Sequence, residues 1–133
     1  MQKVHSDNFR IVLAAMSHLT EAKRITSIMG VYEKFDLILT HDDVSFGKPN
    51  AEIYEKTRTY LSSKSEECLV IEDSVNGIKA GLVGGMHVFA VTNSVTRESV
   101  HACDLLGPEY IVDNLKDLIP KVYSFIKNRK KVR

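Results

Sequence analysis

The sequence predicts an α/β fold, a three-layer, Rossmann-like domain in which helices cover both faces of a mostly parallel sheet. Short apolar runs of strand length alternate along the chain with amphipathic segments of helical period. The runs are continuously apolar, which is typical of parallel strands that are buried on both faces. Because strands joined through helices cross over in the right-handed sense, this alternation favours a parallel sheet.

The predicted elements alternate between strand and helix from one end of the chain to the other. The strands are the apolar runs 11–16, 35–40, 68–71, 87–92 and 110–112. The helices are the amphipathic segments 19–34, 51–61, 76–83, 96–106 and 115–128. We expect Asn50 to act as the N-cap of the second helix. Pro120 is expected to mark a break or a late start in the last helix, because proline cannot donate a backbone hydrogen bond.

Two of these helices have a well-defined apolar face. In the first helix, apolar residues recur at helical spacing and form one stripe, which we expect to be buried. That stripe consists of Leu19, Ala22, Ile25, Ile28, Met29 and Tyr32. The corresponding face of the second helix consists of Ile53, Tyr54, Thr57 and Leu61.

Length and composition predict one ordinary globular domain over residues 1–133, with its core at 10–126 and a basic tail at 127–133. The chain has 133 residues, of which 44% are hydrophobic and 26% charged, so a disordered or fibrous protein is not supported. The net charge is +1, and the 18 basic residues are scattered except in the tail. A nucleic-acid partner is therefore not expected, and the tail is interpreted as a solvated end.

The two cysteines and the start of the chain indicate a cytoplasmic protein. Cys68 and Cys103 lie far apart and show no CxxC spacing, so we interpret them as reduced, small core residues rather than a disulfide or a zinc site. The first ten residues contain no apolar signal region. No window approaches the roughly 20 apolar residues that a membrane span needs, so no membrane partner is expected.

Candidate site residues follow the first strand of the predicted sheet. In parallel sheets, ligands collect where the strands end, beside loops and helix N-termini. Ser17 and His18 come directly after the strand 11–16 and before a helix. A serine hydroxyl beside free backbone N–H groups suits a phosphate oxygen, although the same serine could simply cap the helix.

The loop after the second strand contributes a lysine between glycine and proline. Gly47 permits a turn, and Pro49 restricts the backbone of Lys48, which fixes the direction of its ammonium group. His41, Asp42 and Asp43 lie in the same loop, where no second histidine or cysteine has zinc-like spacing to them. We interpret Asp42 and Asp43 as turn and solvent residues, with the alternative that one of them orients Lys48.

The third strand ends on two acids, Glu72 and Asp73. Carboxylates at the mouth of a parallel sheet are costly unless they meet a cation or hydrogen-bond donors. Mg²⁺ prefers one or two carboxylates together with waters and a substrate phosphate. The simpler alternative is that both acids cap the following helix. Taken with Ser17 and Lys48, however, the acids fit a site for phosphate and magnesium.

These motifs resemble a known family. With Ser17 after an apolar strand, the stretches FDLILTHDDVSFGKPNAEIY and CLVIEDSVNGIKAGLVGGMHVFAVTN are similar to the second, third and fourth motifs of haloacid dehalogenase-like hydrolases. The likeness is strongest to the β-phosphoglucomutase-like and small phosphatase branch, and it covers about 11–126. It implies Mg²⁺-dependent phosphoryl transfer on a small phosphorylated metabolite.

The resemblance also implies a role for each site residue. Ser17 and the His18 amide would hydrogen-bond the transferring phosphoryl group, and Lys48 would neutralise its charge. Asp73 would ligate Mg²⁺, while Glu72 would support the metal directly or through water. Inorganic phosphate is an expected ligand by the same reasoning.

One motif of the family has no counterpart in this sequence. The family's nucleophile and most of its magnesium site come from a first strand that ends in DxDGT or DxDGV. The nearest candidate here is Asp7 in KVHSDNF, where position 9 is Phe and no Gly-Thr follows. Because covalent phosphoryl transfer needs an attacking carboxylate, we expect this chain to be inactive or nearly so, with weak or absent Mg²⁺ binding.

The missing motif also predicts a gap in the sheet. In the family, that strand lies between the strand before Ser17 and the strand that ends at Glu72. We expect residues 5–7 or another chain to fill the gap, or the sheet to rearrange. A cap domain, which selects the substrate in the family, is not recognisable either, so the sequence does not identify the substrate.

Two functions therefore remain open. The first is a phosphatase or phosphomutase core whose N-terminal segment is lost, cleaved or supplied by another polypeptide, so that a complementing segment or an oligomer is an expected partner. The second is a non-catalytic phosphate-binding or interaction module on the same fold. A phosphorelay receiver domain is disfavoured, because its lysine should follow the acidic pair rather than precede it as Lys48 does.

Overall fold

A computed structural model describes residues 9–132 of the chain, with the side chains of 130–132 excepted. Its strands are β1 (Val12–Ala14), β2 (Leu37–Leu39), β3 (Leu69–Glu72), β4 (His87–Val91) and β5 (Ile111–Val112). Its longer helices are α2 (Leu19–Ile28), α3 (Glu52–Leu61), α4 (Val75–Val83), α5 (Arg97–Ala102) and α6 (Leu118–Val132). The order of strands and helices and the α/β fold class are those that the sequence predicts.

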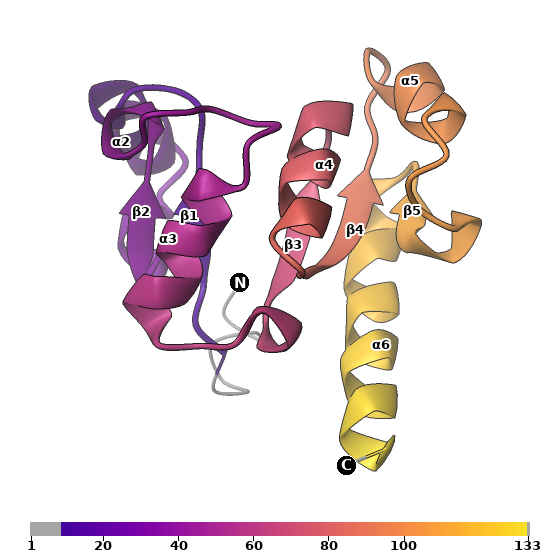
Figure 1. The fold of residues 1–133 in the computed structure, drawn as a ribbon. Coiled ribbons are helices and arrows are strands. Elements are labelled where there is room, and N and C mark those ends of the chain that lie inside the picture. Colours follow the sequence, from indigo (N-terminus) through magenta and orange to yellow (C-terminus); the bar gives the residue numbers. More distant parts are fainter. Residues whose placement is uncertain (1–8, 133) are drawn as a thin grey trace.

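The strands pair in parallel within two separate sheets (Figure 1). β1 pairs with β2, with Ala14 opposite Leu39. β3, β4 and β5 form the other sheet, in which Glu72 lies opposite Ala90. Within the described residues no ladder joins β1 to β3, which agrees with the expected break between these strands. Residues 5–7, the predicted candidates to fill it, lie outside the described part of the chain.

Helices pack on both faces of the strands, and β4 shows how the sequence directs this packing. Successive side chains of a strand point to opposite faces. Val88 and Ala90 belong to the core beneath α3 and α4, whereas Phe89 packs with residues of α6. Figure 1 accordingly shows α3 and α4 in front of the strands and α6 behind β4. Each large apolar side chain buried in this way contributes about 2 kcal/mol to folding.

The helix α2 is shorter and more exposed than the sequence predicts. It ends at Ile28, because Gly30 adopts a φ of 72° that breaks the helical path, and a separate 3-10 turn follows at Tyr32–Lys34. The predicted buried stripe is wrong in extent, since Ile28 is 73% exposed and Met29 67%. Only Ala22 of that stripe is buried, so the described elements leave most of this apolar face open.

The remaining helix boundaries have clear local causes. The side-chain oxygen of Asn50 accepts a hydrogen bond from the N–H of Glu52 at 2.9 Å, although Ala51 occupies the N-cap position. Pro120 lies in the first turn of α6, where its missing N–H leaves no helical bond unmade, and the predicted late start is confirmed. α5 is shorter than expected and ends at Ala102, before the left-handed residue Asp104 (φ 58°).

Two further expectations can be compared with the structure. Cys68 and Cys103 are both free thiols, and both are half-buried rather than core residues. Burial raises the pKa of the Cys68 thiol, with the negative charge of Glu67 acting in the same direction. Over the described residues, none of the helices combines the length and the apolar character needed to cross a membrane.

Candidate phosphate and metal site

The candidate residues come together where β1, β2 and β3 end. These strands point the same way in Figure 1, so their following loops lie at one edge of the molecule. Ser17 follows β1, Lys48 lies in the loop after β2, and Glu72 is the last residue of β3. The structure brings Lys48 and Glu72 into direct contact, although 24 positions separate them in the sequence.

The ammonium group of Lys48 is held by acceptors from two different strands. Its Nζ donates to Oε1 of Glu72 and to the backbone oxygen of Ala14, the last residue of β1, at 3.1 Å. The side chains of Lys48 and Glu72 are only 11% and 7% exposed. Lys48 therefore spans the break between β1 and β3, and it is a largely buried, ion-paired residue rather than a surface lysine.

Two tight approaches of backbone to side chain shape the surroundings of this ion pair. A Cβ atom on Gly47 would lie 2.6 Å from the Met16 side chain, so glycine lets the lysine loop lie against the end of β1. The Lys48–Pro49 peptide bond in the same loop is cis. A Cβ atom on Gly77 would lie 1.9 Å from Oε2 of Glu72. The carboxylate of Glu72 thus lies directly against the first turn of α4.

Tyr54 is a third member of the buried cluster, although its sequence pattern predicts only a place on an apolar helix face. Its hydroxyl donates to Oε1 of Glu72, the same oxygen that accepts from Lys48. Burial raises the pKa of Tyr54 far above its ordinary value, and the negative charge of Glu72 adds to this shift. The hydroxyl therefore remains a donor. A buried tyrosine usually has a hydrogen-bond partner for its hydroxyl, and this rule could have predicted a polar contact for Tyr54 from the sequence.

Asp73 differs from Glu72 in its environment, because it is exposed at the end of β3. Helix α4 is capped by Ser74, whose hydroxyl accepts from the N–H of Gly77 at 3.1 Å. The N-cap of this helix is therefore Ser74, and the alternative that Glu72 and Asp73 cap it is wrong. Carboxylate oxygens are the ligands that Mg²⁺ prefers, and of these two acids only Asp73 is exposed. No third histidine, cysteine or acid joins them in a metal-sized cluster within the described residues.

The N-terminus of α2 is capped by a residue from another loop. Oδ2 of Asp42 accepts from the N–H of Leu19 at 2.7 Å, and its Oδ1 lies 2.7 Å from Nδ1 of His18. These two hydrogen bonds, led by that of Leu19, hold the pKa of Asp42 below its ordinary value. The N-cap position itself is His18, so the alternative role of Ser17 as helix cap is wrong.

Neither aspartate of the lysine loop supports the alternative that one of them orients Lys48. Asp42 binds α2 as described, and Oδ2 of Asp43 accepts from the N–H of Thr40 at 2.8 Å within its own 3-10 turn. The groups that do orient Lys48 are Glu72 and the carbonyl of Ala14. The interpretation of Asp43 as a turn residue is in keeping with these contacts.

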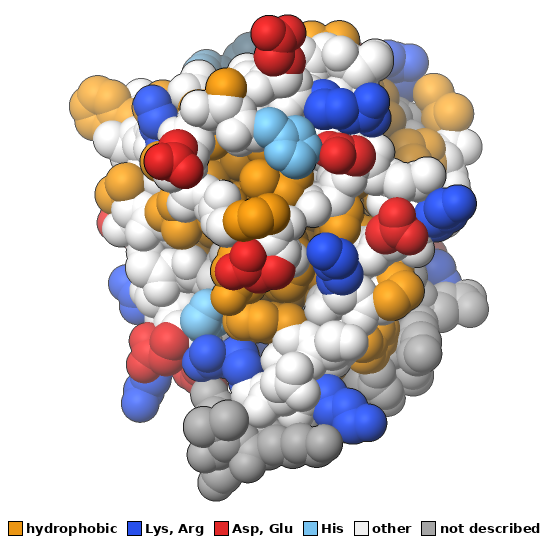
Figure 2. All heavy atoms as spheres, turned by 90° about the vertical axis from the view of Figure 1, so that its right-hand side faces the viewer, with side chains coloured by type: hydrophobic (Ala, Val, Ile, Leu, Met, Phe, Trp, Pro, Cys, Tyr) orange, Lys and Arg blue, Asp and Glu red, His pale blue; other side chains and the backbone are white. Residues whose placement is uncertain are grey.

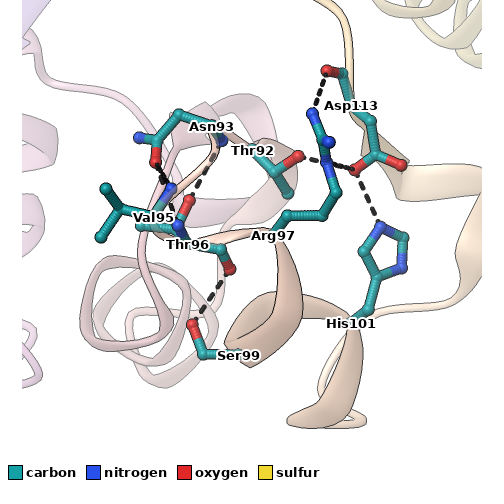
Figure 3. A network of polar contacts seen from close by, with 8 residues as sticks. All are labelled: Thr92, Asn93, Val95, Thr96, Arg97, Ser99, His101 and Asp113. Atoms are coloured by element: carbon teal, nitrogen blue, oxygen red, sulfur yellow. Dashed lines mark hydrogen bonds and ion pairs between the residues drawn. The ribbon is translucent and has the colours of Figure 1, made fainter.

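A second polar network, which no motif of the sequence predicts, joins the ends of β4 and β5 (Figure 3). Oδ1 of Asp113 accepts from the hydroxyl of Thr92 at 2.6 Å and lies 2.8 Å from Nε2 of His101. Arg97 donates to the backbone oxygen of Asp113 at 3.2 Å. The Thr92 hydrogen bond, followed by that of His101, lowers the pKa of Asp113. These contacts tie α5 to the end of β5.

The surface beside this network is hollowed. The hollow has a volume of about 630 Å³, and Arg97, Asp113 and Lys121 contribute to its walls. A second hollow of about 160 Å³ lies among apolar side chains of α4, β4 and α6. Figure 2 shows that this side of the molecule exposes a strip of hydrophobic side chains between charged ones. Neither hollow contains Ser17, Lys48 or Asp73.

Comparison with known proteins agrees with the family that the motifs suggest. Residues 1–85 match the haloacid dehalogenase-like hydrolase family. Pyrophosphatase PpaX of Halalkalibacterium halodurans is 28% identical over 120 residues, which cover 90% of this chain and 54% of that protein. The bifunctional riboflavin kinase/FMN phosphatase of Arabidopsis thaliana is 44% identical over 105 residues, 74% of this chain and 27% of that protein.

The structural comparison gives the same result. The crystal structure of β-phosphoglucomutase from Clostridium difficile superposes with a TM-score of 0.75 at 26% identity. The match covers 99% of this chain and 55% of that structure. The chain therefore spans about half the length of both the pyrophosphatase and the phosphoglucomutase.

Proposed function

Since this chain belongs to the haloacid dehalogenase-like hydrolases, we propose that it forms the phosphate-binding part of a Mg²⁺-dependent phosphatase or phosphomutase for a small phosphorylated metabolite. The observation that carries this proposal is the buried pair of Lys48 and Glu72. It lies where β1, β2 and β3 end, and Ser17 follows β1 while Asp73 directly follows Glu72. Residues 10–126 of the chain would act as one core domain.

Each residue of the site has a proposed role. Lys48 donates two hydrogen bonds to the protein, which leaves its third N–H for a phosphoryl oxygen. The Ser17 hydroxyl and the His18 amide hold the same group. Asp73 would ligate Mg²⁺, and Glu72 would support the metal directly or through water. When bound, the metal would neutralise charge on the phosphoryl oxygens.

The proposal includes a partner segment that supplies the nucleophile. The sequence has no DxD motif, so the chain by itself lacks the carboxylate that would attack phosphorus. We propose that a strand carrying those aspartates inserts between β1 and β3, whether from the same polypeptide or from another. Among the described residues no ladder joins β1 to β3, which supports an inserted strand. The exposure of Phe46 (64%) and Ile71 (46%) beside the site supports it as well.

Hydrolysis of p-nitrophenyl phosphate with Mg²⁺ tests this proposal. The purified chain is assayed alone and after fusion to a segment that ends in DxDGT. Activity is expected only with the segment, and Asp73→Asn in the fused protein should remove most of it. Activity that is equal with and without the segment would contradict the proposed division of roles.

The second candidate is a non-catalytic phosphate-binding module, which the missing nucleophile favours. It predicts that inorganic phosphate binds the chain and that no added DxD segment restores hydrolysis. Isothermal titration calorimetry with phosphate, run beside the hydrolysis assay, separates the two candidates. Robust Mg²⁺-dependent hydrolysis by the unmodified chain would exclude the module.

A further inference from the structure

We infer that Tyr54 is a positioning residue of the phosphate site, which fixes Glu72 and through it the ammonium group of Lys48. The inference rests on the proposed function only in naming phosphate as the ligand. The geometry of the cluster is independent of that function. Nothing in the motifs assigns a role to Tyr54, because its helix position is explained equally well by core packing.

Tyr54 contacts both members of the buried ion pair. Its hydroxyl donates to Oε1 of Glu72, and Nζ of Lys48 lies 5.2 Å from the centre of its ring. An ammonium group within about 6 Å of an aromatic ring centre is attracted to the face of the ring. One side chain thus restrains the carboxylate by a hydrogen bond and the ammonium by its ring.

The cluster is buried enough for these contacts to decide the geometry. Tyr54 is 7% exposed and Glu72 is 7% exposed, so little water competes for their polar atoms. The ring of Tyr54 is itself packed in the main core, together with its fully buried neighbour Ile53. On its other side, the carboxylate of Glu72 lies against Gly77, which limits its movement in that direction.

Loss of the hydroxyl should therefore change where the ammonium lies. In Tyr54→Phe the ring remains, so the packing and the ring contact with Lys48 are preserved. The carboxylate of Glu72 loses one of the two donors on Oε1 and can rotate. Lys48 follows the carboxylate, because its contact with Ala14 alone does not fix its position. A tyrosine that only filled space would have no such effect.

The test compares Tyr54→Phe with Tyr60→Phe in the full chain. Tyr60 lies on the same helix and is 73% exposed, so its variant makes the same chemical change away from the cluster. The first readout is the NMR signal of the Lys48 ammonium, assigned by its loss in Lys48→Met. We expect this signal to shift and to exchange faster with water in Tyr54→Phe, and to be unchanged in Tyr60→Phe.

The second readout is the affinity for inorganic phosphate, measured by calorimetry. The loss of one hydrogen bond to a charged group predicts affinity about tenfold weaker for Tyr54→Phe and unaltered for Tyr60→Phe. An unchanged Lys48 signal in Tyr54→Phe would overturn the inference. If the unmodified chain does not bind phosphate, the proposed function fails, and the Lys48 signal still decides the role of Tyr54.

Discussion

Replacement of Lys48 by methionine should destabilise the protein by about 3 kcal/mol. The substitution keeps most of the apolar stem and removes the charge, so Glu72 is left as a buried carboxylate that is 7% exposed. Breaking a buried ion pair by removing one partner costs about 3–5 kcal/mol. We take the lower end of that range, because the hydroxyl of Tyr54 still donates to Glu72.

Urea denaturation at neutral pH, followed by circular dichroism, measures this change. The matched control is Lys56→Met, since Lys56 pairs with Glu52 at 3.5 Å but its side chain is 49% exposed. The control should lose less than about 1 kcal/mol, as exposed ion pairs do. The double variant Lys48→Met/Glu72→Gln should recover part of the lost stability, because no unpaired charge remains. A loss in Lys48→Met no larger than in the control would refute the reasoning.

Three further predictions concern other contacts of the structure. Gly77→Ala should cost about 1–3 kcal/mol in urea denaturation, because its Cβ would lie 1.9 Å from the carboxylate of Glu72. Asp42→Ala should cost about 1 kcal/mol through the lost cap of α2, and amide exchange in the first turn should accelerate. The hydrogen bond of Thr92 lowers the pKa of Asp113, so the stability that this carboxylate contributes should be present above its unfolded pKa and lost as the pH falls through its folded pKa. Asp113→Asn should therefore flatten the acid side of the stability profile, below about pH 4.

Each of these predictions has a clear contrary result. Gly84→Ala is the control for Gly77, since the nearest atom to its added Cβ is 3.4 Å away, and equal losses in both would contradict the steric argument. Unchanged amide exchange in α2 would exclude Asp42 as its cap. An acid profile that is identical with and without Asp113→Asn would show that this carboxylate is not linked to folding.

The sequence predicts the order of elements well, because strand and helix periods are local properties. The continuous apolar run through Val88, Phe89 and Ala90 predicts a strand that is buried on both faces, and the structure buries both. The sequence predicts the burial of α2 less well. The apolar period of α2 identifies a face that suits burial, but it does not reveal that the described elements leave Ile28 and Met29 open.

The site shows the same division between local and distant information. Lys48 and Glu72 can be selected because each follows a strand, and parallel strands end at one edge of a sheet. The exact partners depend on packing between distant segments. Asp42 caps a helix 23 positions earlier, and Tyr54 meets Glu72 from a helix that the sequence marks only as apolar on that side.

Titration of the isotope-labelled chain with inorganic phosphate, followed by NMR, tests the central claim most directly. If Ser17, Lys48 and Asp73 surround the ligand, saturable shift changes should cluster at the ends of β1 and β3 and in the lysine loop. Changes confined to the hollow beside Arg97, or no saturable change at all, would contradict the proposed phosphate site.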